Sequence, residues 1–540
     1  MDTILSAIVY YTTAAFAGIF AVLYLYFWNA FRHWKTRGVH YAEPSLFVGN
    51  LGGVFSRREG LVDLFRRLYR EAAGHRVVGM FLLGKPVLVL RDLDLVRRVL
   101  TKDAHAFLNR FFMPPEKFDP LFAKSLVAAK GKKWKHLRIK MTPTFTSGKI
   151  RRMLQLVEDC SKKLVRHIDQ EVSEGRPVVV KDAMARYTMD AIASCSFGIN
   201  ANALENPDCE FISKMKMLLE PKGLQMLLGA IIIFTPWLQK FVHAKAFDVG
   251  VTDFVRRTFW DMVDHRKASG IVRKDFVDLL MQLRQDGEVR AEDEKDQEEI
   301  KQDSRYMNVE VSRTDGSDVT LDEDDIVAQA FIFIFAGYET SSSVLTFTLY
   351  ELALNPPVQD RLRREMEDVL EKHGSKVTYV ALAEMSYLDM VVAESLRKYS
   401  PLSFIDRECL SDYTIEGTDI TLKKGTVVIV PSHGIHYDPD IYPDPEKFDP
   451  ERFSDENKGK RSNFAHLPFG EGPRKCIGMR FGLMQVKTGL VHILKTYQVS
   501  PHEDTPLPPL ELHPFSGVTL AKKDIVLTFT GLESTSAAEQ

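Results

Sequence analysis

One cysteine stands in a setting that can hold a reactive sulfur. The segment Phe469–Gly478 reads Phe-Gly-Glu-Gly-Pro-Arg-Lys-Cys-Ile-Gly, and a helical run, Met479–Leu494, follows it. Glycines let backbone N–H groups come close to the sulfur, and a helix start adds positive potential. Together with Arg474 and Lys475, these effects are expected to lower the pKa of Cys476 and hold it as a thiolate, which is a nucleophile or a metal ligand.

Other interpretations of this loop are weaker. A single Cys-x-Gly is compatible with a buried cysteine in a glycine-rich turn, which is the plain alternative for Cys476. A dinucleotide-binding turn does not fit, because Lys475 stands where its third glycine belongs. The other cysteines are widely spaced with no Cys-x-x-Cys pair, which favours reduced thiols over a zinc site or disulfide framework. They are Cys160, Cys195, Cys209 and Cys409.

A carboxylate and a hydroxyl are adjacent within a long apolar run. In the segment Ala336–Thr340, Gly337 and Thr340 both weaken an ordinary helix, through backbone freedom and local hydrogen bonding. Glu339 and Thr340, side by side, can pass protons to a reactant as general acids. A polar interruption of a core helix is the alternative for this segment by itself.

Two more groups pair an arginine with a neighbour on one helical face. Glu394 and Arg397 are three residues apart, and Trp134 and Arg138 are four apart. A pair of the first kind is common, and an exposed one contributes little to stability. A later Pro-Glu-Arg-Phe sequence adds Arg452 as a further charged candidate.

Two histidines and two aspartates imitate the spacing of a metal site. They are His433, His436, Asp438 and Asp440. The segment is rich in turn-forming residues, so we expect an ordinary loop there and no metal.

The cysteine segment resembles the haem-binding loop of cytochromes P450, whose pattern is Phe-x-x-Gly-x-Arg-x-Cys-x-Gly. All its fixed positions match: Phe469, Gly472, Arg474, Cys476 and Gly478. The resemblance implies that Cys476 ligates the haem iron, that Phe469 packs near the sulfur and that Arg474 contacts a propionate. Thiolate ligation raises electron density on iron and favours O–O cleavage.

The remaining groups are similar to the other motifs of that family. Arg110 is the nearest candidate for a further propionate-binding arginine, although its spacing leaves the match open. By the same resemblance, the other groups supply a structural triad beneath the haem (Glu394, Arg397 and Arg452), proton delivery (Glu339 and Thr340) and propionate contacts (Trp134, Arg138 and Arg407).

The elements that position these residues are mainly helical. Most of residues 88–285 has helical periodicity. Thr320 and Glu323 are expected to form a capping box that starts a helix of about 34 residues, about 51 Å long. A second helical run is expected from about Pro357 to Tyr399, with one break at Gly374.

The non-helical segments are fewer. His75–Leu90 predicts a hairpin, and the chain after Pro401 alternates turns and short strands. Residues 284–319 are rich in charge and predict a solvated loop. The apolar segment Leu224–Trp237 is too short to span a bilayer and is expected to be buried or to touch the membrane.

The N-terminal segment predicts a membrane anchor. Residues from Thr3 to Phe31 contain no Asp, Glu, Lys or Arg, and as a helix they extend about 43 Å, beyond the bilayer core of about 30 Å. A basic cluster, Arg32–Arg37, follows and places that side in the cytosol. A cleaved signal peptide is the alternative, but its charge precedes the apolar stretch.

We therefore expect a mainly α protein with a small β-rich lobe, the cytochrome P450 fold with a single N-terminal transmembrane helix. Its expected parts are an anchor (1–31), a hinge (32–52), a haem-thiolate catalytic domain (53–532) and a disordered tail (533–540). The 540 residues are 45% hydrophobic and 27% charged with a net charge of −2, so nothing favours nucleic acid as a partner.

Three segments look like insect microsomal P450s, which handle plant toxins and insecticides: 142–149, 187–198 and 468–481. The resemblance implies a monooxygenase that inserts one atom of dioxygen into a lipophilic substrate. Because no flavin or nicotinamide motif is present, the electrons are expected from NADPH–cytochrome P450 reductase, with cytochrome b5 as a possible second donor. Substrate contacts are expected from Phe111–Ser125, Phe331–Phe335, Leu402–Phe404 and Phe515–Val518.

The resemblance also implies single-pass attachment to the endoplasmic reticulum membrane, with the catalytic domain in the cytosol. Three alternatives for function stay open: a haem-thiolate isomerase or dehydratase, a biosynthetic P450 that acts on an endogenous lipid or hormone, and a non-catalytic haem sensor or carrier.

Overall fold

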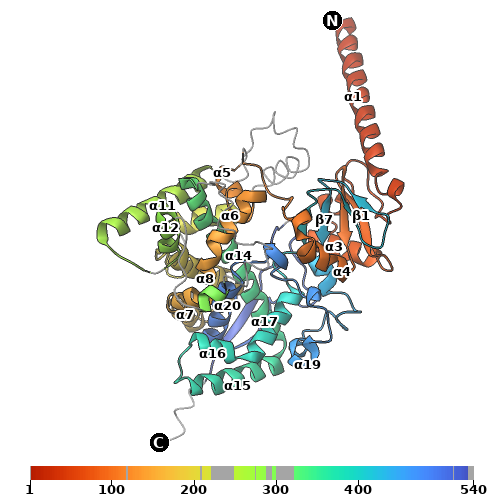
Figure 1. Ribbon diagram of the computed structural model, residues 1–540. Helices are drawn as coiled ribbons and strands as arrows, with labels where there is room; N and C mark the ends of the chain where they lie inside the picture. The colour runs from red at the N-terminus through yellow and green to blue at the C-terminus, as the bar shows by residue number, and fades with distance from the viewer. Residues whose placement is uncertain are drawn as a thin grey trace, which may run out of the picture.

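A sheet-rich part and a larger helix-rich part make up the body, and a single helix projects from the sheet-rich part (Figure 1). The computed structural model describes residues 2–116, 119–206, 210–219, 249–273, 275–286, 295–299, 321–514 and 516–532. The predicted fold class, mainly α with a small β-rich lobe, is confirmed.

The principal sheet lies beside the N-terminal helix and contains the predicted hairpin. β1 pairs antiparallel with β2, β2 pairs parallel with β7, and β7 pairs antiparallel with β4. Apolar side chains fill both faces, and α3 supplies Leu64 and Leu68 to one of them. The strands, in spatial order, are β1 (Val77–Leu82), β2 (Lys85–Leu90), β7 (Val427–Val430) and β4 (Ile405–Glu408).

Two small sheets complete the strands. One has the order β3 (Val178–Val179), β9 (Val526–Gly531), β8 (Tyr497–Pro501), and the other pairs β5 (Tyr413–Thr414) with β6 (Thr421–Leu422).

The helices of the described residues are α1 (Asp2–Phe31), α2 (Gly52–Phe55), α3 (Leu61–Glu71), α4 (Leu93–Arg97), α5 (Pro120–Ala123), α6 (Gly131–Met141), α7 (Ser147–Ser173), α8 (Val180–Ser196), α9 (Glu210–Leu219), α11 (Val249–Ser269), α12 (Phe276–Asp286), α14 (Glu323–Leu354), α15 (Pro356–Lys372), α16 (Tyr379–Glu384), α17 (Ser386–Lys398), α18 (Ser432–His436), α19 (Asp455–Lys458) and α20 (Met479–Leu494).

The long central helix exists, but its predicted cap was wrong. The capping box is formed by Asp322 and Asp325: the Asp325 N–H donates to Asp322 Oδ1 at 2.7 Å, and the Asp322 N–H donates to Asp325 Oδ2 at 3.2 Å. Glu323 therefore lies inside the first turn of α14, and Thr320 lies outside the described residues. An aspartate caps as well as a threonine, so a run of acidic residues allows several registers.

The second helical run is divided more often than predicted. It forms α15, α16 and α17, with the expected break at Gly374, where φ is 63°, and a further one at Met385. The second break lets the Glu365 carboxylate, on α15, accept hydrogen bonds from the N–H groups that begin α17, Tyr387 and Leu388, at 2.7 and 2.9 Å.

The prediction of a solvated loop over 284–319 was wrong for the part that the structure describes. Residues 284–286 end α12, and residues 295–299 are helical. Asp296 is buried, and Glu299 accepts a hydrogen bond from Ser147 N–H at 3.0 Å and lies 3.3 Å from the Arg480 guanidinium. Ser147, on α7, and Arg480, on α20, thus compensate the charge of the Glu299 carboxylate.

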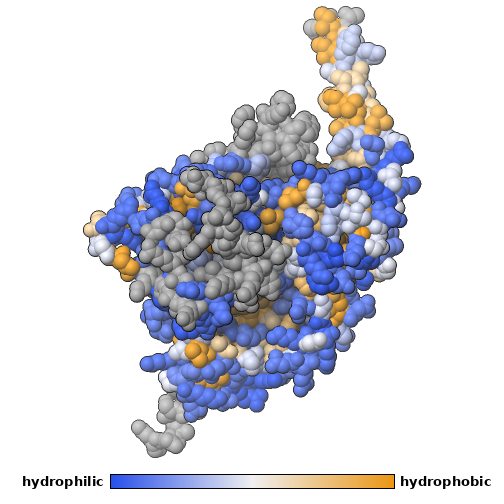
Figure 2. Space-filling view, in the orientation of Figure 1, coloured by the Kyte–Doolittle hydropathy of each residue, from blue (hydrophilic) through white to orange (hydrophobic). Residues whose placement is uncertain are grey.

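The N-terminal helix α1 projects away from the body (Figure 1), and its surface is largely apolar (Figure 2). The apolar stretch of α1 is not buried at all, whereas α14, which is also a long apolar helix, is mostly buried in the body. The exposure of α1 is consistent with membrane anchoring.

The expected hinge, 32–52, packs against the sheet. The Trp34 ring is completely buried, its Nε1–H donates to the Met80 carbonyl at 3.1 Å, and a Cβ on Gly79 would meet the ring at 2.4 Å. Phe31 contacts Phe81 with ring centroids 5.1 Å apart. The end of α1 is thus joined to β1 by side-chain packing as well as by the chain.

Candidate active site

The cysteine loop is shaped by glycines at positions that no other residue could occupy without strain. Gly470 and Gly472 have φ of 68° and 75°, in the left-handed region. A Cβ on Gly472 would lie 1.7 Å from the Leu100 carbonyl oxygen. The Cys476 N–H donates to the Phe469 carbonyl at 2.9 Å, so the loop closes on itself immediately before α20.

The pKa of Cys476 was expected to be lowered, and that direction is wrong for the protein alone. Burial raises the pKa, and this outweighs the lowering by the Gly478 N–H, which donates to the sulfur, and by nearby Arg138, Arg110 and Lys475. The side chain is nevertheless exposed. Both observations hold if the sulfur borders a hollow inside the molecule, where a bound cation would favour the thiolate.

Buried arginines from separate segments gather near this loop. The pKa of Arg474 is held well below its usual value by burial first and then by Arg110, Arg407 and Arg138. Burial and Arg110 lower the pKa of Arg407 to about 9. The Asp406 carboxylate offsets part of this positive charge, and it already accepts hydrogen bonds from two backbone N–H groups. Such an excess of buried cations is costly unless an anion binds among them.

The predicted pair on α6 contacts the loop from its other side. The Arg474 guanidinium lies 4.1 Å from the Trp134 ring centroid and donates to the Leu108, Leu126 and Ala129 carbonyls at 2.7–3.2 Å. Arg138 donates to the Lys475 carbonyl at 2.9 Å. The structure therefore brings Trp134, Arg138, Arg407 and Arg474 together.

Arg110, which the sequence analysis left open, belongs to the same cluster. Its Nε is buried without a hydrogen-bond partner among the described residues. It lies between η3 (Ala104–Phe107) and α5 in a segment without regular structure, so no periodic pattern could point to it.

The polar interruption of α14 sits where this helix crosses α8. A Cβ on Gly337 would meet Ile192 Cδ1 at 2.8 Å, and the Thr188 hydroxyl donates to the Tyr338 carbonyl at 3.0 Å. Ala336 is exposed although its neighbours in this core helix are largely buried, and Thr340, one turn later, is partly exposed. The Ala336–Thr340 face of α14 is therefore accessible.

Glu339 and Thr340 do not point the same way. The Thr340 hydroxyl donates to the Ala336 carbonyl at 2.6 Å, on the accessible face. Glu339 is buried, and its carboxylate accepts from Lys181 Nζ, on α8, at 2.7 Å. The expected side-by-side arrangement was wrong, because consecutive residues of a helix project about 100° apart.

The triad residues are in contact and buried. Arg397 binds both oxygens of Glu394, at 2.7 and 2.8 Å, and Arg452 Nε lies 3.4 Å from Glu394 Oε1. Arg397 also donates to the His436 carbonyl at 2.8 Å. These contacts join α17 to α18 and to the short helix η6 (Pro450–Phe453).

The ring nitrogens of the histidines with metal-like spacing contact main-chain groups. His436 Nε2 accepts from the Leu467 N–H at 3.0 Å, and its Nδ1 lies 3.1 Å from the Arg397 carbonyl oxygen. His433 is buried, and burial lowers its pKa to about 3. Asp438 accepts a hydrogen bond from the Tyr69 hydroxyl at 2.8 Å.

Comparison with known proteins identifies the family. A family model described as Cytochrome P450 matches residues 40–529. Cytochrome P450 6j1 of Blattella germanica is 40% identical over 513 residues, covering 94% of this chain and 96% of that protein. Probable cytochrome P450 6a14 of Drosophila melanogaster is 37% identical over 524 residues, covering 96% and 97%. This chain belongs to the cytochrome P450 family.

A P450 binds haem through a cysteine thiolate, and the residues present fit that group. Cys476 offers a soft sulfur that is accessible although burial raises its pKa. Burial and neighbouring arginines lower the pKa values of Arg407 and Arg474, and the two propionates of haem would supply negative charge beside these guanidinium groups. The cofactor and the monooxygenase class predicted from the sequence are confirmed.

The segments expected to contact substrate form two aromatic groups in this P450. Phe112 lies 5.5 Å from Phe404, measured between ring centroids, and Phe122 lies 6.4 and 6.1 Å from Phe331 and Phe335. The Thr519 N–H donates to the Pro401 carbonyl, which places residues 516–518 near 402–404. Residues 117, 118 and 515 lie outside the described residues, as does the apolar segment 224–237.

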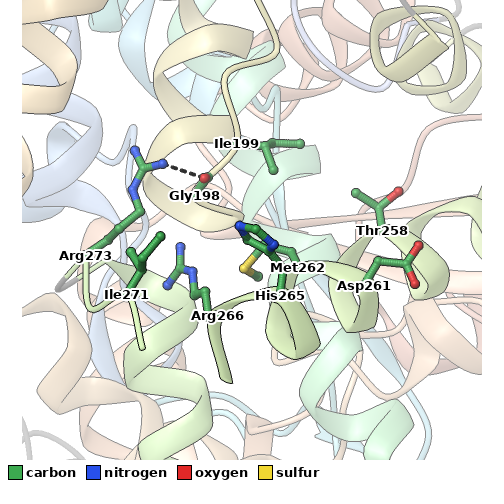
Figure 3. Close-up of a pocket in the computed structure, with 9 residues that line it drawn as sticks. All are labelled: Gly198, Ile199, Thr258, Asp261, Met262, His265, Arg266, Ile271 and Arg273. Carbon is green, nitrogen blue, oxygen red and sulfur yellow. Dashed lines mark hydrogen bonds between the residues drawn. The ribbon is translucent and has the colours of Figure 1, made fainter. Parts of the chain in front are cut away.

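A pocket of ≈ 470 Å³ lies away from these motifs, between the end of α8 and α11, and Figure 3 shows the residues that line it. Arg273 donates to the Gly198 carbonyl at 2.6 Å, and Asp275 and Asp278 bind Arg266. Its two arginines are already paired, and none of its lining residues belongs to the haem or proton motifs.

Proposed function

We propose that this monooxygenase oxidises lipophilic foreign compounds, of the plant-toxin or insecticide class, with electrons from NADPH–cytochrome P450 reductase. Two observations carry the proposal: Thr340 presents a hydroxyl on the accessible face of α14, and the segments expected to contact substrate bring phenylalanines together in two groups. An aromatic lining binds apolar molecules of varied shape, because burial of apolar surface is not directional.

The roles of the chain follow from these positions. Cys476 is the ligand of the haem, which when bound activates dioxygen. Thr340 holds a proton at Oγ1 on the substrate side of α14, and Glu339 is the acid behind it. The arginine cluster orients the propionates, and the triad of Glu394, Arg397 and Arg452 is structural, since its three side chains are buried and paired with one another.

Two other functions predict different results. A haem-thiolate isomerase or dehydratase needs neither dioxygen nor reductase, and its turnover would be independent of NADPH. A biosynthetic P450 would accept one endogenous lipid or hormone and reject most of a panel. The intact pair Glu339–Thr340 favours oxygen chemistry, because proton delivery is the task for which these side chains are suited.

The purified protein with reductase and NADPH should oxidise several members of a panel of lipophilic plant compounds and insecticides. We expect NADPH-dependent product with one oxygen atom from labelled dioxygen. A panel that includes sterols and fatty acids separates the biosynthetic function. Product formed without NADPH would contradict the proposal.

The proposed docking surface for reductase comprises exposed lysines of α6. Lys132 and Lys135 are exposed, whereas Lys133 binds the buried Asp325 at 2.6 Å, and Lys475 and Arg480 bind Glu471 and Glu299. Lys133 pairs with Asp325 in the first turn of α14, so replacing Lys133 would disturb the fold as well as docking.

Lys132→Glu with Lys135→Glu should slow reductase-supported turnover about 5- to 30-fold at low ionic strength, if each reversal costs about 0.5–1 kcal/mol. The effect should shrink at high salt, because ions screen exposed charges. Peroxide-driven turnover needs no reductase and should be unchanged. Lys522→Glu with Lys523→Glu, on exposed lysines near β9, is the matched control. Equal loss by both routes would contradict docking.

The exposed helix α1 and the basic cluster after it support a place in the endoplasmic reticulum membrane with the catalytic domain in the cytosol. In this orientation the exposed lysines of α6 would lie on the cytosolic side, where the reductase is proposed to dock. Cytochrome b5 is proposed as a second donor. Fractionation of cells and protease protection of the body would test both the organelle and the orientation.

A further inference from the structure

Lys181 is the one cation that an ion pair connects to the acid of the oxygen-activating motif among the described residues. It lies in the first turn of α8, 158 positions before Glu339, and no sequence motif includes it. Its Nζ donates to Glu339 Oε1 at 2.7 Å, to Ser342 Oγ at 2.7 Å and to Ser343 Oγ at 3.2 Å. All three ammonium hydrogens are therefore directed at α14.

The amine is buried at its tip, but the residue is connected to solvent. Burial lowers the pKa of Lys181, and Glu339 partly offsets this. The side chain as a whole is 25% exposed, and neighbouring Val179 is 39% exposed. Because the apolar stem is near the surface and the amine reaches inward, Lys181 bridges the outside of the molecule and the interior of α14.

Glu339, in contrast, has little access to water by itself. Its side chain is 8% exposed, and its carboxylate pairs with Lys181 of α8, while Thr340 lies on the accessible face of α14. As a carboxylate, Glu339 has to receive a proton before it can donate one. Lys181 is the group in position to provide it.

We propose that Lys181 loads Glu339 with the proton that Glu339 then delivers toward Thr340. The Nζ–H bond breaks and an Oε1–H bond forms, which leaves a neutral amine beside a neutral carboxylic acid. The carboxyl turns about its side-chain bonds, gives its proton to the Thr340 hydroxyl, and the hydroxyl passes its own proton on. The amine regains a proton from water at the exposed end of α8. This relay rests on the proposed function.

The alternative is that Lys181 only neutralises Glu339 and holds it in place. An arginine distinguishes the two, since a guanidinium pairs with a carboxylate but does not release a proton near neutral pH. A methionine removes both abilities while it keeps the length of the stem.

The test compares Lys181→Met and Lys181→Arg with the wild type in product formed per NADPH. We expect both variants to lose about 10- to 100-fold, at or below the lower end of what a positioned acid–base group contributes. Peroxide-driven turnover should be retained, because peroxide carries its own protons. Lys487→Met is the control: it breaks the ion pair of another buried lysine, with the exposed Asp389 at 2.8 Å, and should leave the ratio unchanged. Full coupling in Lys181→Arg would overturn the relay.

A second readout needs no turnover. Infrared spectra at neutral pH should show a protonated-carboxyl band in Lys181→Met that disappears in Lys181→Met/Glu339→Gln, and no such band in the wild type or in Lys181→Arg. Absence of the band in Lys181→Met would show that Lys181 does not control the charge of Glu339. A wild type without NADPH-dependent product would contradict the proposed function, while the infrared result would still decide whether the two residues share a proton.

Discussion

Thr340 is a partly exposed polar side chain of α14, whereas its polar neighbours Glu339 and Ser341 are buried. Its hydroxyl is bonded to the carbonyl one turn earlier, and this kind of bond adds little to helix stability. The hydroxyl is therefore replaceable structurally, and its position on the accessible face is explained better by chemistry than by folding.

Thr340→Ala should uncouple the enzyme without unfolding it. We expect product per NADPH to fall at least about ten-fold while NADPH is still consumed, since a positioned proton donor contributes about 10²–10⁴-fold and water replaces it only in part. The escaping reducing equivalents should appear as peroxide. Thr340→Ser, which keeps the hydroxyl, should recover most of the coupling. A Thr340→Ala variant with the wild-type ratio would remove Thr340 from proton delivery.

The sequence was sufficient for residues whose role is encoded locally. The left-handed glycines and the helix start around Cys476 are adjacent in the chain, so their spacing predicts the loop. Lys181 and Arg110 could not be found in this way, because each meets its partners across more than 150 residues. The direction of the Cys476 pKa was also missed, since burial is a property of the folded molecule.

At the level of elements, the ion pair within α17 fastens the helix to the segment that precedes the cysteine loop. Glu394 and Arg397 are both completely buried, and Arg397 donates to main-chain carbonyls of His436 and Pro445. A pair with the same spacing on a surface would contribute little; burial makes the loss of either partner costly.

Arg397→Ala should destabilise the protein by about 3–5 kcal/mol, because it leaves the Glu394 charge buried without its main partner. Chemical denaturation of the purified variant measures this loss. Arg361→Ala is a suitable control, since its ion pair with Glu451 is exposed and worth about 0–1 kcal/mol. Equal midpoints for the two variants would contradict the structural role of the triad.

The types of the long elements were predictable, and their ends were not. Apolar periodicity predicts α14 over most of its length, but three aspartates and a glutamate compete to cap it. The second break, at Met385, depends on Glu365 of another helix, so the local sequence does not predict it. Residues 295–299 pack against the body through charged side chains. A charged sequence by itself predicts solvent exposure, so this packing could not be predicted.

The molecule as a whole joins its anchor to the body through Trp34. This side chain belongs to the apolar core beside β1, although it lies only three residues after α1. The segment expected as a hinge is therefore part of the packing, and the position of the cut decides whether a shortened chain is stable.

Removal of residues 1–31 should leave a body that folds and binds haem, because that cut keeps Trp34 and loses mainly exposed apolar surface. In the shortened chain, Trp34→Ala should cost about 3–5 kcal/mol, the usual effect of emptying a buried tryptophan site. Thermal unfolding and haem content measure the two effects. A shortened chain without haem would show that α1 belongs to the core.

The central claim is that Cys476 holds the haem iron, and the carbon-monoxide spectrum of the reduced protein tests it most directly. The wild type should give the red-shifted Soret band of a thiolate-ligated haem, and Cys476→Ala should lack it. The buried Cys160 and Cys195, replaced one at a time, should leave the band unchanged. If Cys476→Ala retains the red-shifted band, another residue ligates the iron and the assignment is contradicted.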